Sequence, residues 1–242
     1  MTRSAHRIAL APGYVLHHRP WRDTSRILEV LTREHGRLTL FARAVRGPSA
    51  KLAPLLQPFQ PLLLSWSGRG EAPQLTGAER AEQCAPLPPP CLLSAFYLNE
   101  LLMRLTTRHD PLPEVFDCYH ATLASLRAGR ALERCLRLFE KRLLEQLGYG
   151  VDLLSAAPGG EPVRPEGYYH FRPGHGLSAT PGAGGGALAG SSLLALAREE
   201  LSAARELEDA RRLLQAALAD GLEGRPLATR AVAKAMVRKA AR

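Results

Sequence analysis

Residues 25–43 read SRILEVLTREHGRLTLFAR, and this stretch decides the fold of the N-terminal part of the chain. Two runs rich in aliphatic and β-branched residues, 25–32 and 37–43, flank the tripeptide Glu34-His35-Gly36. Glycine accepts the positive φ that a tight turn between antiparallel strands requires. The pattern therefore predicts a β-hairpin with Gly36 in the left-handed region.

Three more short apolar runs surround this hairpin, at residues 14–18, 62–66 and 74–78. Five or six short strands are too few for two large sheets. A small closed barrel is the economical arrangement, because closure removes exposed strand edges. We therefore predict a small β-barrel over residues 1–80.

The pattern changes after the segment CAPLPPPC, residues 84–91. Three consecutive prolines disfavour a helix and stiffen the chain, so residues 81–91 are predicted to be a Pro-rich linker. Residues 92–242 are predicted to form a mainly helical domain with an irregular Gly- and Pro-rich insertion at about 155–190, which makes the fold class α+β. The expected helices span residues 92–105, 112–126, 131–147 (ended by Gly148 as its C′ residue), 191–201, 206–218 and 229–240.

Positive charge is concentrated at the two ends of the chain. The 242 residues include 32 Lys and Arg, of which 28 are Arg, and 23 Asp and Glu, so the formal net charge is +9. Residues 1–80 carry a net +7 and residues 225–242 a net +6. This asymmetry favours a nucleic-acid or acidic-protein partner, although a GC-rich genome or a solubilising surface would also explain the arginines.

Several classes of protein are excluded. No run of 18 apolar residues is long enough to span a membrane, and no apolar stretch typical of a signal peptide follows Met1, so we expect a cytoplasmic protein that does not bind membranes. The cysteines form no CxxC pair, which argues against a zinc ribbon or a thioredoxin-type site. Reduced thiols are expected at Cys84, Cys91, Cys118 and Cys135.

The sequence contains no persuasive catalytic constellation. The glycine-rich stretch 182–186 lacks the Lys-Ser/Thr of a P-loop, and no GxSxG motif occurs. His170 and His175 have no nearby cysteine with which to hold zinc. We therefore expect a binding protein without cofactor or metal rather than an enzyme.

The strand expected at residues 37–43 offers a binding surface. Alternation places four residues on one of its faces: Arg37, Thr39, Phe41 and Arg43. Arginines beside an aromatic ring suit single-stranded nucleic acid, because cations follow the phosphates and rings stack on the bases. The alternative is that Phe41 belongs to the core and the arginines only flank the strand.

Two neighbouring segments contribute more basic residues. Arg46 and Lys51 lie in a loop that is suited to gripping phosphates. Arg19, Trp21 and Arg22 form another basic and aromatic group, in which Trp21 is either a stacking platform or a hydrophobic plug.

The helix expected at 131–147 carries a basic stripe beside its apolar one. The stripe consists of Arg130, Arg134, Arg137 and Lys141. Glutamates at positions 133, 140 and 145 lie near it, so ordinary ion pairs within the helix are the simpler explanation. The alternative is a groove for a peptide that carries both acidic and apolar groups.

Eight motifs follow one another along almost the whole chain: YVLHHRPWRDTS (14–25), LTREHGR (31–37), LQPFQPL (56–62), WSGRGE (66–71), FYLNELL (96–102), LFE (138–140), LGYG (147–150) and GRPLATR (224–230). Their order resembles that in the RecO family of bacterial DNA-repair and recombination mediators. The resemblance implies an N-terminal OB-fold followed by a helical domain. It also implies a nucleoid-associated protein of the RecF pathway that binds single- and double-stranded DNA, anneals complementary strands and helps load the RecA recombinase.

The resemblance also implies protein partners and site residues. The partners are RecR and the acidic, Phe-ended tail of the single-strand binding protein. The barrel residues Arg37, Arg43, Arg46 and Lys51 become candidates for DNA binding. The pocket for the tail would use five residues: Arg134, Arg137, Phe139, Lys141 and Arg142. Some relatives hold zinc with cysteines in the segment equivalent to 150–175, but this chain has none there, so no zinc is expected. An RNA-binding OB-fold protein and a protein–protein adaptor without DNA binding are the alternatives.

Overall fold

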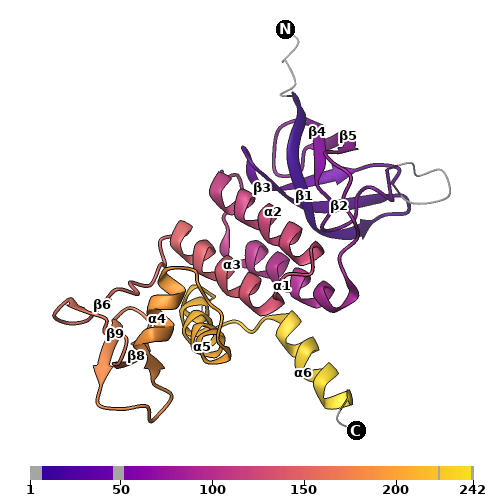
Figure 1. Cartoon of the computed structure of the whole chain (residues 1–242). Helices are drawn as coiled ribbons and strands as arrows, with labels where there is room; N and C mark the ends of the chain where they lie inside the picture. Colours follow the sequence, from indigo (N-terminus) through magenta and orange to yellow (C-terminus); the bar gives the residue numbers. More distant parts are fainter. Residues whose placement is uncertain (1–6, 46–51, 223, 241–242) are drawn as a thin grey trace. The chain divides into compact units, whose positions relative to one another are not determined.

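A computed structural model of the chain describes residues 7–45, 52–222 and 224–240 (Figure 1). The chain divides into two compact units. The first unit contains the N-terminal strands and the first two helices, up to Arg127, together with the end of the chain from Met236, and the second unit runs from Ala128 to Ala235.

Five strands build the barrel of the first unit: β1 (Arg7–Trp21), β2 (Ser25–Thr32), β3 (Gly36–Ala42), β4 (Leu62–Ser67) and β5 (Gln74–Arg80). Their order is β1-β2-β3-β5-β4, and β1 pairs with β4 as well as with β2, which closes the ring. Strands β3 and β5 meet through one parallel pair, Phe41 and Gln74, whereas the other neighbours are antiparallel. This is the strand order of the OB-fold, a five-stranded Greek-key barrel, and it confirms the predicted fold class.

Alternating side chains fill the interior of the barrel. The residues at every second position of β2 and β3 are buried and belong to one apolar cluster: Leu28, Val30, Leu38, Leu40 and Ala42. Burying a side chain of this size contributes roughly 2 kcal/mol. The alternation that predicts these two strands therefore also selects their core face.

Gly36 fixes the β2–β3 hairpin where the sequence predicts it. Its φ is +65°, and a Cβ atom at this position would lie 2.1 Å from the carbonyl oxygen of Asp110. The Thr32 hydroxyl donates a hydrogen bond of 2.9 Å to the Gly36 carbonyl. Both the positive φ and the close approach require glycine.

Strand β1 is longer than the five residues that its apolar run predicts. Its first half, from Arg7 to Gly13, pairs with β4, and its second half, from Gly13 to Trp21, pairs with β2. The register shifts between Val15 and His17, where a bulge interrupts the ladder. The first half carries few β-branched residues, so its strand conformation comes from pairing with β4 rather than from its own sequence.

Helices α1 (Pro89–Leu105) and α2 (Pro113–Arg127) follow the barrel in the first unit. The prediction that prolines keep residues 81–91 out of a helix is wrong for the end of that segment. Pro88 is the N-cap of α1, and prolines occupy its first two positions. Proline is tolerated there because the first N–H groups of a helix have no partner within the helix.

The second unit contains α3 (Leu132–Gln146), α4 (Gly190–Ala197), α5 (Ala204–Gly221) and most of α6 (Ala228–Ala240). Gly148 ends α3 as predicted, with φ at +80°. The Gly148 N–H donates to the Glu145 carbonyl at 3.1 Å, and the Tyr149 N–H donates to the Leu144 carbonyl at 2.8 Å. These two hydrogen bonds form a Schellman motif.

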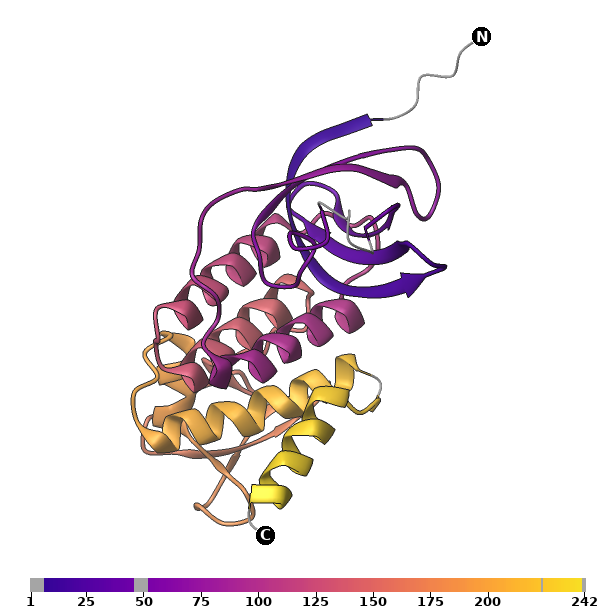
Figure 2. The ribbon, with the colours of Figure 1, turned by 90° about the vertical axis from the view of Figure 1, so that its right-hand side faces the viewer.

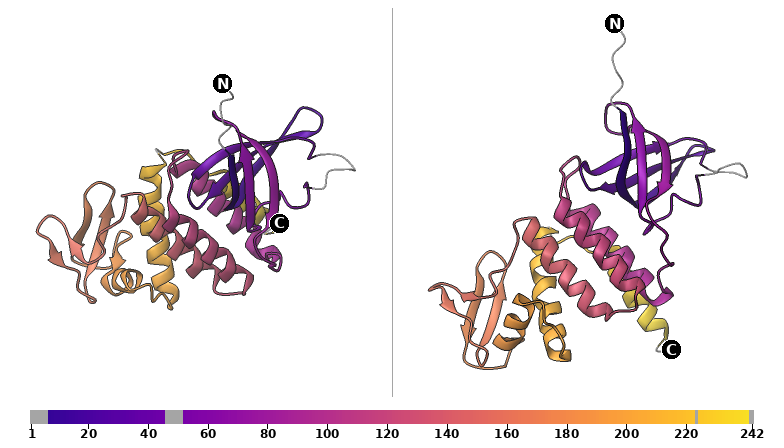
Figure 3. Two further views of the ribbon diagram at one scale, coloured as in Figure 1. Left: turned by 90° about the horizontal axis from the view of Figure 1, so that it is seen from above. Right: turned by 45° about the horizontal axis from the view of Figure 1, so that its top comes forward.

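The segment at about 155–190 is more regular than the sequence predicts. It forms five short strands: β6 (Ser155–Ala156), β7 (Glu161–Pro162), β8 (Tyr168–Arg172), β9 (Gly176–Thr180) and β10 (Leu188–Ala189). Strands β8 and β9 form the orange hairpin in Figure 3, and β10 pairs with β8. Apart from residues 168–171, the pattern of these strands is hidden by frequent Gly and Pro.

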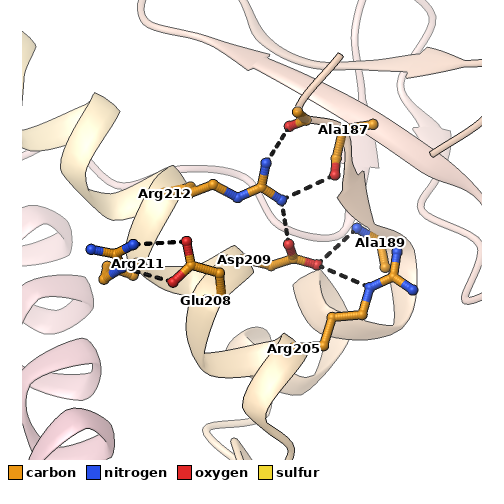
Figure 4. A network of polar contacts seen from close by, with 8 residues as sticks. Ala187, Ala189, Arg205, Glu208, Asp209, Arg211 and Arg212 are labelled. Carbon is orange, nitrogen blue, oxygen red and sulfur yellow. Dashed lines mark hydrogen bonds and ion pairs between the residues drawn. The ribbon is translucent and has the colours of Figure 1, made fainter. Parts of the chain in front are cut away.

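A buried carboxylate attaches this small sheet to α5 (Figure 4). Asp209 accepts a hydrogen bond of 3.1 Å from the Ala189 N–H and one from Arg212. The Arg212 guanidinium also donates to the carbonyls of Gly186 and Ala187, at 2.7 and 3.1 Å. The glycine-rich loop therefore ends in a hydrogen-bonded anchor, although its composition alone indicates a mobile loop.

Candidate nucleic-acid interface

The outer face of β1, β2 and β3 is divided into two parts. The part near Tyr14 and Leu16 is covered by α1 and α2. The Asn99 amide donates a hydrogen bond of 2.8 Å to the Leu16 carbonyl and accepts one of 2.6 Å from the Tyr119 hydroxyl. The Tyr14 hydroxyl lies 2.7 Å from Nδ1 of His120, and burial raises the pKa of Tyr14. This part of the barrel is an internal packing surface.

Arg37 belongs to the covered part. Its guanidinium forms an ion pair of 3.1 Å with Glu29 and donates to the Thr106 carbonyl at 2.7 Å, and its side chain is only 12% exposed. Burial lowers the pKa of Arg37, although the Glu29 carboxylate opposes that shift. Glu29 also accepts a hydrogen bond of 2.6 Å from Arg108. The structure thus uses Arg37 to hold the barrel against the end of α1, and we leave it out of the candidate interface.

The other part of the face is open. Arg19 of β1 lies opposite Ile27 of β2, which lies opposite Phe41 of β3, so these three side chains form a row across the strands. Trp21 and Arg43 occupy the next positions on the same face. We call this surface, made of Arg19, Trp21, Ile27, Phe41 and Arg43, the basic–aromatic face.

Each aromatic ring of the basic–aromatic face has an arginine beside it. The Arg19 guanidinium carbon lies 6.0 Å from the centroid of the Trp21 ring, and that of Arg43 lies 5.8 Å from the centroid of the Phe41 ring. Trp21 is 42% exposed, whereas Phe41 is half-buried. Phe41 points away from the core, unlike its neighbours in β3, so the alternative that makes it a core residue is wrong.

Of the remaining DNA candidates, the structure describes only Arg22, which lies outside this row. Arg22 is exposed in the β1–β2 turn, where its φ is +50°. Arg46 and Lys51 lie outside the described residues. The residue that sequence reasoning missed is Ile27, and the strand register that places it between Arg19 and Phe41 is the signal that finds it.

The predicted peptide site on α3 differs from the expected open groove. Phe139 is 1% exposed, so it does not line an open surface. Arg137 is buried as well and forms an ion pair of 2.6 Å with Glu140. These two side chains are part of the packed interior.

Three cations of the same helix converge on one residue that the sequence did not suggest, Glu199. Glu199 lies 3.2 Å from Lys141 and accepts a hydrogen bond of 3.0 Å from Arg142, while its main-chain carbonyl accepts one of 2.8 Å from Arg134. The hydrogen bond from Arg142 lowers the pKa of Glu199. Lys141 also pairs with Glu145, 3.0 Å away, as the simpler explanation of the stripe expects.

Neither a metal centre nor a membrane span is found in the described part of the chain. No three His, Cys, Asp or Glu side chains gather closely enough there to hold an ion. No helix within those residues is long and apolar enough to cross a bilayer.

Comparisons with known proteins agree with the fold over nearly the whole chain. The family model described as Recombination protein O N terminal matches residues 7–84, and the one described as Recombination protein O C terminal matches residues 91–231. A DNA repair protein RecO from Alkalilimnicola ehrlichii is 46% identical over 239 residues, which cover 97% of this chain and 94% of that protein. Another, from Methylococcus capsulatus, is 43% identical over 227 residues, which cover 93% of this chain and 92% of that protein. The chain therefore belongs to the RecO family of DNA repair proteins.

Proposed function

We propose that the protein is a non-enzymatic DNA-binding mediator of recombinational repair in the RecF pathway. It would anneal complementary single strands and help load the RecA recombinase onto DNA that is coated by single-strand binding protein. The observation that supports this proposal is the basic–aromatic face, which lies on an OB-fold barrel in a member of the RecO family.

The face suits single-stranded DNA because it combines stacking with phosphate binding. A base stacked on Trp21 or Phe41 brings its phosphates near the adjacent Arg19 or Arg43 guanidinium. Stacking on an aromatic side chain contributes about 1–3 kcal/mol per base and works for any base. Sequence-independent binding is what annealing of arbitrary complementary strands requires.

Annealing also explains why no catalytic group is needed. The reaction breaks no covalent bond, and its barrier comes from the repulsion between two polyanions and from secondary structure within each strand. Arginines that neutralise phosphates reduce the repulsion between the two strands. Aromatic rings that stack on bases of one strand compete with the secondary structure of that strand.

Two protein partners complete the proposal, namely RecR and the acidic tail of the single-strand binding protein. A tail that binds at α3 would have to compete with Glu199 for Lys141 and Arg142. The carboxylates of the tail would then take the place of the Glu199 carboxylate beside Lys141 and Arg142. These two cations would therefore keep an acidic partner when the tail binds. The work would take place in the cytoplasm, at the nucleoid.

The test is fluorescence anisotropy with a labelled single-stranded oligonucleotide across a salt series. The variant Arg19→Gln/Arg43→Gln removes both cations of the face, and Arg7→Gln/Arg69→Gln removes two other exposed barrel cations. Single strands give a salt slope of about −0.7 per phosphate contact, so the first variant should flatten the slope by about 1.4 and weaken binding about tenfold or more. The control variant should bind nearly as tightly as the wild type.

Equal binding by the two variants would refute the assignment of the face. Tighter binding of RNA than of DNA with the same sequence would favour the RNA-binding alternative, because the 2′-hydroxyl distinguishes the two. No binding of either nucleic acid at moderate salt would favour the adaptor.

A further inference from the structure

A cavity of about 280 Å³ lies in the second unit, where α3 and α5 end. Its walls come from the residues that follow α3, from the turn between β8 and β9, and from the end of α5. The two helices pack against each other, and α5 is the long helix that runs across the lower part of Figure 2. The basic–aromatic face contains none of the residues that line this cavity.

Two aromatic residues line the cavity. Tyr149 is 52% exposed, and its hydroxyl has no hydrogen-bond partner among the described residues. Phe171, near the end of β8, is half-buried. A Cβ atom added at Gly148, Gly174 or Gly176 would meet no heavy atom within 4 Å, so the backbone of these lining residues borders open space. A ligand that enters the cavity can therefore reach an aromatic ring.

The charged groups of the lining are acidic. Asp152 and Asp220 both line the cavity, and no Lys, Arg or His occurs among the described residues that do so. Arg172 and His175 belong to the β8–β9 turn, but they are exposed and do not line the cavity. Asp220 forms no hydrogen bond or ion pair with the described residues. Its carboxylate therefore needs no internal contact to be broken before it meets a ligand.

The Asp152 carboxylate is held in place by its own loop. It accepts hydrogen bonds of 2.9 and 3.1 Å from the N–H groups of Leu154 and Ser155, both at Oδ1. The Ser155 hydroxyl donates to Oδ2 at 2.7 Å and lowers the pKa of Asp152, so the carboxyl is ionised at neutral pH. Oδ2 keeps a lone pair for a further donor.

The ends of two helices strengthen the negative potential. Both α3, which ends at Gln146, and α5, which ends at Gly221, have their C-terminal ends beside the cavity. Aligned peptide dipoles place a partial negative charge at the C-terminal end of a helix, and this charge stabilises a cation near the last turn. The helix ends and the two carboxylates therefore favour a ligand of the same sign.

A positively charged group with a flat surface fits this cavity. The faces of aromatic rings attract cations. A guanidinium stacks on such rings, is weakly hydrated and presents a planar fork of N–H donors to carboxylates, whereas an ammonium is more strongly hydrated. Phosphates would be repelled, and residues 151–224 as a whole contain six Arg against ten Asp and Glu. These properties select an arginine side chain rather than nucleic acid.

We propose that this cavity binds an arginine side chain that a protein partner presents on its surface. The inference does not depend on the proposed annealing function. The chain would hold DNA through cations of the first unit and a basic segment of another protein through carboxylates of the second. The two ligands then use surfaces of opposite charge and do not compete for the same residues.

The experiment titrates short peptides into isotope-labelled full-length protein and follows the amide resonances of Gly148, Gly174 and Gly176. The probe is a tripeptide of alanine, arginine and alanine with blocked ends. Replacing its arginine with citrulline keeps the planar shape and removes the charge, and replacing it with lysine keeps the charge and removes the planar group. The variants are Asp220→Asn and Tyr149→Leu, and the control Glu166→Gln removes an exposed carboxylate of the second unit that does not line the cavity.

We expect saturable shifts at the three glycines with a dissociation constant of about 1–10 mM, because one side chain supplies only part of a protein interface. The citrulline peptide should bind about tenfold or more weakly and the lysine peptide about threefold or more weakly. Asp220→Asn and Tyr149→Leu should each weaken binding of the arginine peptide about threefold or more, and Glu166→Gln should change it less than about twofold. Unfolding curves verify that each variant is folded.

Equal binding of the arginine and citrulline peptides, or shifts that do not saturate at the three glycines, would overturn the proposal. Binding by the cavity variants that matches the Glu166→Gln control would also overturn it. A lysine peptide that binds as tightly as the arginine peptide would refute the selection of a guanidinium. Self-association of the wild type that Asp220→Asn abolishes would reassign the cavity to a second copy of this chain. Failure of the wild type to bind DNA would refute the proposed function, but not the arginine site.

Discussion

The hydrogen bonds of Asn99 allow a quantitative test of how the barrel is held by the helices. Asn99 is 1% exposed on α1, and it serves the Leu16 carbonyl, which lies at the bulge of β1. A bulge interrupts the ladder between strands, so the Leu16 carbonyl depends on a side-chain donor. The Tyr119 hydroxyl donates to the same amide from α2.

Replacing Asn99 with leucine keeps the branched shape of the side chain and removes both hydrogen bonds. The buried Leu16 carbonyl and the Tyr119 hydroxyl each lose this partner. Leaving a buried polar group unsatisfied costs about 1–3 kcal/mol, so the substitution should lower the free energy of unfolding by about 2–5 kcal/mol. Tyr119→Phe removes only one of the two hydrogen bonds and should cost about 1–2 kcal/mol.

The assay is urea unfolding followed by tryptophan fluorescence, because Trp66 is buried in the barrel core. In the double variant Asn99→Leu/Tyr119→Phe the tyrosine hydroxyl is gone as well, so the loss of its hydrogen bond to Asn99 is counted only once. The double variant should therefore be destabilised by about 1 kcal/mol less than the sum of the two single variants. Strict additivity, or an Asn99→Leu variant within about 0.5 kcal/mol of the wild type, would refute the reasoning.

Two further predictions concern carboxylates of the second unit. The Arg142 hydrogen bond lowers the pKa of Glu199, so its stabilisation is present above about pH 4.5 and is lost as the pH falls through the lowered folded-state value. Glu199→Gln should lower the free energy of unfolding by about 1 kcal/mol at pH 7. The free energy of unfolding of this variant should also fall less steeply than that of the wild type as the pH is lowered below about 4.5, and an equally steep fall would contradict this. Asp209→Asn should weaken the anchor of Arg212 and the hydrogen bond from Ala189, so amide exchange at Ala189 should accelerate, whereas unchanged protection would count against the anchor.

Local patterns predict the barrel well because its strands are built from local alternation. The hairpin at Gly36 and the core face of β3 both follow from residues within a few positions of one another. The start of α1 was less predictable, since proline is excluded from the interior of a helix but accepted in its first turn. The short strands β8 and β9 pair with each other within a Gly-rich segment, where composition hides the alternation.

The candidate site was only partly predictable because distant residues decide which cations stay at the surface. Alternation places Arg37 and Arg43 on the same face of β3. It does not reveal that Thr106, 69 residues further along the chain, accepts the Arg37 guanidinium. In the same way Arg142 meets Glu199, which is 57 residues away. The number of arginines in the sequence therefore overestimates the number that can bind DNA, because some of them form ion pairs and hydrogen bonds within the folded protein.

The outer face of β1, β2 and β3 has a part that packs against helices and an open part that carries the basic–aromatic face. The ion pair of Arg33 with Asp117, the hydrogen bond from Arg37 to the Thr106 carbonyl and the hydrogen bonds of Asn99 hold one end of the face against the helices. The open end then projects from a fixed base, so its rings need little ordering when a strand binds. Removing the hydrogen bonds that hold the barrel against the helices should therefore change protein stability, whereas removing the arginines of the basic–aromatic face should change DNA binding. Asn99→Leu should lower stability and leave the salt slope of DNA binding unchanged while the protein is folded, whereas Arg19→Gln/Arg43→Gln should flatten the slope and leave the unfolding curve nearly unchanged.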